Sequence, residues 1–387
     1  MGEWKEYKLG DVALTVTSGG TPKSSEPSFY NGNIPWLNTK EINFNRINKT
    51  EKYITEKGLQ FSSAKWIPKY SIIVAMYGAT AGKVAYSLID LTTNQACCNI
   101  VIDNKKAVAL YVYYYLQFSY NDLKNLACGA AQQNLNINVI SNYSIILPPL
   151  SEQKRIASIL GSLDDKIDLL HHENETLEAM AETLFRKWFI EDAKDELSET
   201  ILGDVVETTS GGTPSRKNEK YYQKGTIDWV KSKELNGTFL LETEEKITED
   251  AVANSSAKFI PANSVLIAMY GATVGENAII AKEMTCNQAI CALIPNENYP
   301  YTYLFLWAKL MKEEFINLAC GAAQQNISQV LIKQQQVCSD IDAVKQFHST
   351  TEPLFNKIKQ NEIQLSSLKD IKNMILPKLM NNESINE

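Results

Sequence analysis

The stretch that most resembles a catalytic motif is GATAGK at 78–83, which could be taken for a phosphate-binding loop. Such a loop needs two glycines five positions apart and a Ser or Thr after the lysine. Here the glycines are four positions apart and Val84 follows the lysine. A second copy of the stretch has Glu276 in place of the lysine, and its carboxylate would repel a phosphate. We therefore predict a β-turn and no nucleotide site.

Other residues that could do chemistry lack the partners that chemistry needs. Leu147-Pro-Pro-Leu150 has no polar residue that could hold an amino group, as the Asp/Asn-Pro-Pro-Tyr tetrapeptide of adenine methyltransferases does. His171 and His172 lie in an acidic stretch, which is typical of a solvated helix face. We find no nucleophile–base pair, no carboxylate cluster for a metal and no Gly-rich cofactor loop. The seven cysteines include no CxxC pair, so we expect buried, reduced thiols. The sequence indicates a binding module without catalysis, cofactor or metal of its own.

The elements that would position a binding site are written twice in the chain. Seven blocks recur in constant order at an offset of 192 or 193 residues, which indicates a duplication. The blocks are LGDV, SGGTP, IPW (IDW in the second copy), SSAK, AMYGAT, NQA and LACGAAQQN, beginning at Leu9, Ser18, Ile34, Ser62, Ala75, Asn94 and Leu126, and again at Leu202, Ser210, Ile227, Ser255, Ala268, Asn287 and Leu318.

Each copy is predicted to be a mixed α/β (α+β) domain, because its strands do not alternate with crossover helices. In the first copy we expect strands near 9–17, 36–38, 71–77, 83–88, 96–102 and 144–147, a short helix over 55–61, and a longer helix over 111–126 that stops at Gly129.

A long amphipathic segment follows each domain. From Ile156 to Trp188, apolar residues recur at alternating spacings of four and three, the pattern of a helix that packs along another helix. A weaker seam with the same spacing runs from Phe347 to Leu379. At 1.5 Å per residue the first helix would be about 55 Å long. We expect Ser151 to cap it, and Asp340 to cap the second helix.

Each seam contains one central asparagine, Asn174 and Asn361. If the helices pack antiparallel with their centres opposed, facing residues have numbers that sum to about 535, as these two do. We predict that the two amides face each other and fix the register of a coiled coil. The alternative is that both lie at solvated edges.

The predicted domain boundaries follow from these patterns. They are 1–150 for the first domain, 151–190 for the first helix, 191–198 for a linker, 199–339 for the second domain, 340–380 for the second helix and 381–387 for a tail. Two similar domains joined by antiparallel helices are expected to be related by a pseudo-two-fold axis, which suits the symmetry of a DNA duplex.

The net charge of −7 does not exclude nucleic acid, because the acidity is unevenly distributed. Residues 1–150 contain 14 basic and 10 acidic side chains, giving +4, whereas residues 151–198 contain 6 and 12, giving −6. This distribution suggests that a partner supplies part of any DNA-binding surface. Without a long apolar run or a signal-peptide core, we expect a cytoplasmic protein that does not enter a membrane.

Taken together, these motifs resemble the specificity (S) subunits of type I restriction–modification systems, over essentially the full length. One departure is that Gln334–Ile341 replaces the Leu-Pro-x-Pro-x-x-Glu-Gln stretch that the family often repeats after its second domain. The motifs that carry the resemblance are Leu9–Val12, Ser18–Pro22, Met76–Lys83, Asn94-Gln95, Ile146–Ile156, Asn174–Met180 and Ile375–Met380.

The resemblance implies a non-catalytic subunit with two target-recognition domains, each recognising one half of a gapped duplex DNA site. The two conserved helices would space these domains and dock two methyltransferase (M) subunits, and restriction (R) subunits would join the full complex. S-adenosylmethionine, ATP and Mg are then expected only on partner subunits. Two alternatives are an interaction scaffold that binds only proteins, and the detached recognition module of a fused nuclease–methyltransferase.

Phosphate contacts favour small polar loops with free N–H groups and cations, and base contacts favour Asn, Gln, Lys and Arg on exposed loops. The alternative is that the repeated polar residues are scaffold. Specificity is then expected where the halves differ, such as 43–49 against 236–242, although the near-identity of the blocks suggests related half-sites. The DNA-binding candidates are Ser18, Gly19, Gly20, Thr21, Lys23, Asn38, Lys40, Tyr77, Thr80, Lys83, Asn94, Gln95, Gln132, Gln133 and Asn134 in the first half, and Ser210, Gly211, Gly212, Thr213, Arg216, Lys231, Lys233, Tyr270, Thr273, Asn287, Gln288, Gln324, Gln325 and Asn326 in the second.

Overall fold

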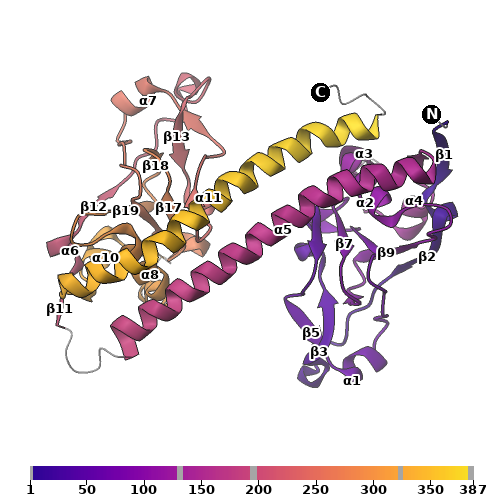
Figure 1. The fold of residues 1–387 in the computed structure, drawn as a ribbon, viewed down its shortest axis with the longest axis horizontal. Helices are drawn as coiled ribbons and strands as arrows, with labels where there is room; N and C mark the ends of the chain where they lie inside the picture. The colour runs from indigo at the N-terminus through magenta and orange to yellow at the C-terminus, as the bar shows by residue number, and fades with distance from the viewer. Residues whose placement is uncertain (1–2, 129–133, 192–197, 321–325, 382–387) are drawn as a thin grey trace. The chain divides into compact units, whose positions relative to one another are not determined.

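The computed structural model describes residues 3–128, 134–191, 198–320 and 326–381 (Figure 1). The chain divides into two compact units, Met1–Lys166 with Leu368–Glu387, and Ile167–Ser367. Each unit contains one copy of the repeat and a part of both long helices. The two similar mixed α/β domains are therefore confirmed, and the pseudo-two-fold arrangement between them stays a prediction.

A five-stranded sheet forms the centre of the first unit. Its middle strand, β6, is apolar and buried throughout, as its sequence IIVA predicts. Neighbouring strands are antiparallel except for β4 and β7, which are parallel. The strand order is β2 (Ala13–Ser18), β9 (Cys97–Ile102), β6 (Ile72–Ala75), β7 (Val84–Ser87) and β4 (Asn45–Ile47).

Smaller elements complete the first unit. The short helix α1 (Glu56–Gln60) begins at Thr55, whose side chain accepts a hydrogen bond from Gly58 N at 3.1 Å. The remaining elements are a three-stranded sheet of β5 (Lys52–Ile54), β3 (Tyr30–Leu37) and β8 (Thr92–Thr93), a pair of β1 (Lys5–Lys8) and β10 (Ser144–Leu147), helices α2 (Ala109–Phe118), α3 (Tyr120–Cys128) and α4 (Ile137–Ser141), and 3₁₀ turns η1 (Leu9–Val12), η2 (Pro27–Phe29), η3 (Thr39–Glu41) and η4 (Gly78–Thr80).

Two predicted elements of this unit differ in the structure. The strand expected near 9–17 begins only at Ala13, because Leu9–Val12 forms the 3₁₀ turn η1. Leu9 and Val12 are both buried, and residues three apart share a side in a 3₁₀ turn but not in a strand. The helix expected over 111–126 is two helices separated by Ser119, because α2 is buried on nearly all sides whereas α3 is mostly exposed and amphipathic.

The second unit repeats this architecture. Its five-stranded sheet has the order β12 (Glu207–Ser210), β19 (Ile290–Ile294), β16 (Val265–Ala268), β17 (Asn277–Ile280) and β14 (Phe239–Leu240). The other elements are the sheet β15 (Lys246–Ile247), β13 (Ile227–Val230) and β18 (Thr285–Cys286), the pair β11 (Glu199–Ile201) and β20 (Gln336–Cys338), helices α6 (Leu202–Val205), α7 (Glu249–Ala253), α8 (Tyr301–Leu310), α9 (Lys312–Cys320) and α10 (Gln329–Lys333), and 3₁₀ turns η6 (Glu219–Tyr221), η7 (Ser232–Glu234) and η8 (Gly271–Thr273).

The two long helices are α5 (Leu150–Arg186), which continues as a π-helical turn η5 (Lys187–Glu191), and α11 (Ile341–Met380). Asp340 caps α11, since its carboxylate accepts a hydrogen bond from Ala343 N at 3.0 Å. Ser151 is not the cap of α5, because the helix already begins at Leu150 and Pro149 O accepts the first N–H groups. Among the described residues, no helix is long and apolar enough to cross a membrane.

Within each unit the long helices pack antiparallel through a polar contact. In the second unit Asn361 Nδ2 donates to Asn174 Oδ1 at 2.8 Å, so the predicted contact between the seam asparagines is present. In the first unit Lys372 Nζ donates to Asp164 Oδ1 at 2.7 Å, and Tyr114 donates to the other oxygen of Asp164 at 2.7 Å. The paired residue numbers sum to 535 and 536, so the register in the two units agrees to within one residue.

Candidate nucleic-acid interface

The repeated polar blocks meet at one place in each unit, beginning with two parallel strands. β3 and β8 are parallel and end together, with Leu37 opposite Thr93. The next residues, Asn38 and Asn94, are therefore neighbours, and Asn94 Nδ2 donates to Asn38 Oδ1 at 3.3 Å. In the second unit the parallel strands β13 and β18 end in the same way, which places Lys231 beside Asn287.

The SGGTP loop joins this place from the end of β2. The hydroxyl of Thr21 donates to Gln95 Oε1, and in the second unit Thr213 donates to Gln288 Oε1. All four side chains belong to exposed residues. The same polar pair is thus presented at the surface of both units.

The turn after β6 adds two more blocks. Thr80 Oγ1 donates to the carbonyl of Thr39 at 3.0 Å, so η4 lies against η3. In the second unit the equivalent Thr273 instead donates within its own turn, to Tyr270 O. Asn326 forms a β-bridge with Tyr270 and accepts from Gly271 N at 3.3 Å, which places the end of the QQN block beside this turn.

Two candidate phosphate ligands serve packing instead. Gly19 and Gly20 are buried, and their N–H groups donate to the carbonyls of Cys97 and Thr93. A Cβ on either glycine would lie within 2.2 Å of a neighbouring backbone atom. The free N–H groups predicted at these positions are therefore not available. Gly212 repeats the arrangement by donating to Cys286 O, and a Cβ at Gly211 would lie 2.0 Å from the same oxygen.

An aromatic pair holds the SGGTP loop in each unit. Trp36 Nε1 donates to Gly20 O at 2.9 Å and Tyr30 donates to Pro22 O at 2.6 Å. Trp229 and Tyr222 make the same two hydrogen bonds to Gly212 and Pro214, at 3.0 and 2.6 Å. This aromatic platform gives the polar loop a fixed position without any charged group.

The asparagines that follow β8 and β18 have a structural role. Asn94 Oδ1 accepts a hydrogen bond from Ala96 N at 3.1 Å, and Asn287 Oδ1 accepts from Ala289 N at the same distance. These contacts support the scaffold alternative for both residues. The Nδ2 of Asn38 is buried and has no hydrogen-bond partner among the described residues.

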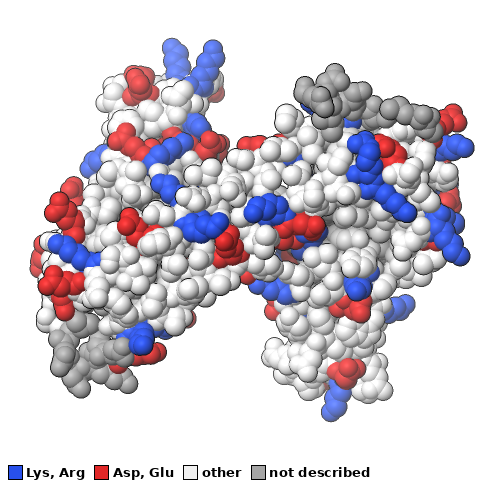
Figure 2. Space-filling model, in the orientation of Figure 1, with Lys and Arg blue, Asp and Glu red and all other residues white. Residues whose placement is uncertain are grey.

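The candidate cations are exposed or half-buried, and most contact acids. Lys23 lies 3.9 Å from Glu26, and Lys233 lies 2.6 Å from Glu244. Lys40 pairs with Glu51 in the same way, and Lys83 donates to Asn43 Oδ1 at 2.7 Å. In the view of Figure 2, basic and acidic side chains alternate on the surface of each unit.

Two carboxylates that sequence reasoning missed tie the loops together. Glu41 accepts from the backbone N–H groups of Asn38 and Glu51, at 2.9 and 2.8 Å. Glu234 accepts from those of Lys231 and Glu244, at 2.8 and 2.7 Å. The signal for this glutamate clamp is a repeated Lys-Glu pair, at 40–41 and 233–234, with the offset of 193 that the other blocks share.

The remaining candidates are placed less closely. Ser18 pairs with β9, Ser210 donates to Gln329 Oε1, and Tyr77 and Tyr270 are exposed beside the turns η4 and η8. Asn134 is exposed. Gln132, Gln133, Gln324 and Gln325, like the linker over 192–197, lie outside the described residues.

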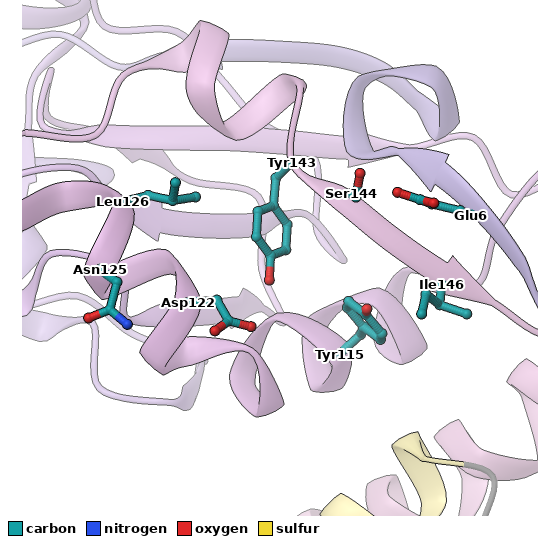
Figure 3. A pocket seen from close by; sticks show the side chains of 8 residues that line it. All are labelled: Glu6, Tyr115, Asp122, Asn125, Leu126, Tyr143, Ser144 and Ile146. Carbon is teal, nitrogen blue, oxygen red and sulfur yellow. The ribbon is translucent and has the colours of Figure 1, made fainter. Parts of the chain in front are cut away.

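A hollow elsewhere in the first unit contains none of the candidate residues (Figure 3). Its volume is about 630 Å³, and Tyr143 and Asp122 are among the residues that line it. Burial raises the pKa of Tyr143 above its ordinary value. Across the described parts of the chain, no group of three or more His, Cys, Asp and Glu could hold a metal ion.

Comparison with known proteins gives one consistent family. A family model described as type I restriction modification DNA specificity domain matches residues 1–179 and 195–338. The specificity subunit of the type I restriction enzyme MjaIX from Methanocaldococcus jannaschii is 28% identical, with 98% of this chain and 93% of that protein covered. The HindI specificity subunit from Haemophilus influenzae is 22% identical, with coverage of 99% and 100%.

A solved structure shows that the fold is shared as well. The crystal structure of a type I restriction–modification S subunit from M. genitalium aligns with a TM-score of 0.60 at 17% identity, and the alignment covers 98% of this chain and 96% of that one.

Proposed function

Since the chain belongs to the type I restriction modification DNA specificity family, whose model matches both of its repeats, we propose that each domain recognises one half of a gapped duplex DNA site. The observation that carries this proposal is the convergence of the repeated polar loops on one place in each unit. There Thr21 and Gln95 are exposed as a hydrogen-bonded pair, and Thr213 and Gln288 repeat it. Hydroxyl and amide side chains on fixed loops suit contacts with phosphates and base edges.

The long helices supply the surface for protein partners in this proposal. Apart from its buried seam, α5 has exposed apolar side chains at Leu169 and Met180, which are 59% and 50% exposed. On α11, Ile371 and Met374 are 41% and 57% exposed. Exposed apolar side chains of this kind mark interaction surfaces when they gather on one element. We propose that each unit docks one methyltransferase subunit by its helices, giving two in all.

A shallow hollow along α5 supports the same docking mode. Its volume is about 620 Å³. Small side chains at Thr176, Ala179 and Thr183 alternate there with larger ones, which allows a partner helix to approach closely. S-adenosylmethionine, ATP and Mg are then bound by the partner subunits, and restriction subunits join through them. This chain contributes recognition and spacing, and no catalytic step.

Co-expression with a methyltransferase subunit tests this function. We expect a complex that binds duplex DNA, with a log Kd that rises linearly with the logarithm of the salt concentration. The complex should also methylate a two-part site in the host genome. Sequencing of modified bases gives that site directly. A complex that forms without any DNA binding would favour the interaction scaffold. A chain that binds neither partner nor DNA would contradict the proposal as a whole.

A further inference from the structure

The duplication makes it possible to separate what the two domains share from what distinguishes them. The glutamate clamp, the Thr–Gln pair and the aromatic platform occur in both units with closely similar hydrogen bonds. A residue that is present in both units cannot make the two domains prefer different sequences. Any difference in preference must come from positions where the residue type changes.

Three such positions surround the shared scaffold. The first unit has Ser24, Asn38 and Lys52 where the second has Arg216, Lys231 and Glu245, at the repeat offsets of 192 and 193. The second unit therefore carries two cations and a carboxylate in place of a hydroxyl, an amide and a single cation. We call Arg216, Lys231 and Glu245 the ion cluster.

Arg216 is held in a fixed plane. Its guanidinium lies 4.1 Å from the ring of Tyr222 and 5.1 Å from that of Trp229. Both of its terminal nitrogens donate to Glu245, one of them at 2.8 Å. These hydrogen bonds lower the pKa of Glu245, so that it stays a carboxylate near neutral pH. A guanidinium that is stacked on a ring and hydrogen-bonded through two nitrogens is pre-organised to bind a planar group with two acceptors.

Lys231 is held more loosely beside it. Its Nζ lies 3.4 Å from Glu245 and 3.5 Å from Glu244, at the long end of ion-pair distances. Its side chain is 21% exposed and that of Arg216 is 54% exposed. Arg216 is more than half exposed, and exposed ion pairs contribute only about 0–1 kcal/mol to stability, so folding alone gives little reason for its pair with Glu245. The stacking on Tyr222 can keep the plane of Arg216 while its exposed nitrogens exchange Glu245 for another acceptor, and Lys231 makes long ion pairs that it can exchange.

Given the proposed function, on which this inference rests, we propose that Arg216 and Lys231 are the base-reading side chains of the second domain and that they select guanine. Guanine presents two acceptors, N7 and O6, in the major groove, and Arg and Lys are the side chains that match them. The first domain has no cation at either position. The two half-sites therefore differ, in contrast to the related half-sites that the repeat alone suggests.

Selection from duplexes randomised in both half-sites, with the complex of this chain and a methyltransferase subunit, tests the proposal. The variants are R216S and K231N, which install the residues of the first domain, and the transplant S24R/N38K/K52E, which installs the ion cluster in the first domain. The matched control is K233N, because Lys233 shares the partner Glu244 and its counterpart Lys40 occurs in the other unit. Co-purification with the methyltransferase subunit reports folding of each variant.

We expect R216S and K231N to relax the guanine preference in one half-site only, and to weaken binding to the native site about 5- to 150-fold. The transplant should add a guanine preference to the other half-site, and K233N should weaken binding without changing either sequence. If the wild-type complex selects a two-part site and R216S and K231N select the same one, the inference is wrong and the proposed function stands. If the wild-type complex selects no sequence, the proposed function fails first.

Discussion

Gly20 shows how closely the SGGTP loop is packed. A Cβ built on it would lie 2.2 Å from Ala64 N and 2.3 Å from the carbonyl carbon of Ser63. Both neighbours are backbone atoms, which cannot move aside as the end of a flexible side chain can. The glycines of this loop are therefore explained by close approach, and the recognition groups that we propose are the exposed residues that follow them.

The first prediction uses this contact. Gly20→Ala should lower the free energy of unfolding of its domain by about 1–3 kcal/mol or more, because the added methyl overpacks a rigid site. Gly78→Ala is the control, since a Cβ there meets nothing within 4 Å and only its φ of +76° is strained, at a cost of about 1 kcal/mol. Urea unfolding of the two variants should separate them. Equal losses would mean that the loop can shift to accept the methyl group.

The second prediction concerns buried thiols. Burial raises the pKa of Cys98, Cys286 and Cys291 to about 12. The folded protein keeps these protons while the unfolded chain loses them above about pH 8.5. Their contribution to stability is therefore fully present below pH 8.5 and is lost as the pH rises toward 12, with a slope of about 1.4 kcal/mol per pH unit for each thiol.

Urea unfolding between pH 8 and pH 9, where the tyrosines of the unfolded chain with their pKa near 10 are still mostly protonated, measures this slope. The triple variant C98A/C286A/C291A should lose less stability over the same range, whatever its stability at pH 8. Identical slopes for the variant and the wild-type protein would show that other groups dominate the alkaline loss.

Residue types indicated which polar loops belong to the candidate site better than they predicted what each residue does there. Asn94 has the right chemistry for a base contact, yet its side-chain oxygen accepts a hydrogen bond from Ala96 N. Glu41 was not among the candidates, yet it ties two loops together through their N–H groups. A local sequence shows the donors and acceptors of a side chain, whereas its partners are set by strands that are distant in the chain.

At the scale of elements, the seams of α5 and α11 were predictable because a buried contact between long helices imposes one spacing throughout. The sum of residue numbers even gave the register in which Asn174 meets Asn361. The 3₁₀ turn at Leu9–Val12 and the break at Ser119 were not predictable, because burial by the rest of the domain decides them.

The third prediction tests the asparagine contact. Asn361→Leu should cost about 1–3 kcal/mol, because it leaves the buried Oδ1 of Asn174 without its donor. The double variant N174L/N361L should recover most of that loss, since two leucines can pack in the seam. A double-mutant cycle in urea gives the coupling between the two positions. If the stability lost in the double variant equals the sum of the losses in the two single variants, the contact between the asparagines contributes no coupling energy to the helix pair.

For the whole molecule, the important feature is that each unit carries exposed apolar side chains on its own stretch of long helix. The duplicated blocks predicted two domains, because turns and close contacts need the same residues in both copies. The exposed apolar residues on the helices were hidden in the sequence, because they interleave with the buried seam. Met180 and Ala181 are adjacent and both apolar, yet Met180 is 50% exposed and Ala181 is fully buried, a difference that the structure shows and the sequence does not.

The fourth prediction follows from the two surfaces. Met180→Asp should remove one methyltransferase subunit from the complex and Met374→Asp the other, because a charge in an apolar interface must be desolvated. Native mass spectrometry should then show one bound subunit for each single variant and none for the double variant. Leu14→Asp is the control, since Leu14 is 64% exposed but lies on a strand. Two subunits retained in every variant would place the docking surface elsewhere.

The glutamate clamp has a consequence for how new preferences can arise. Glu41 and Glu234 hold their loops through main-chain N–H groups, so the side chains at 38 and 231 are not needed for the grip. Mutation can change the side chains at these two positions while the hydrogen bonds of the framework stay the same. A lineage that carries this chain could thus acquire a new target sequence by point mutations, without a new fold and without losing its partner subunits.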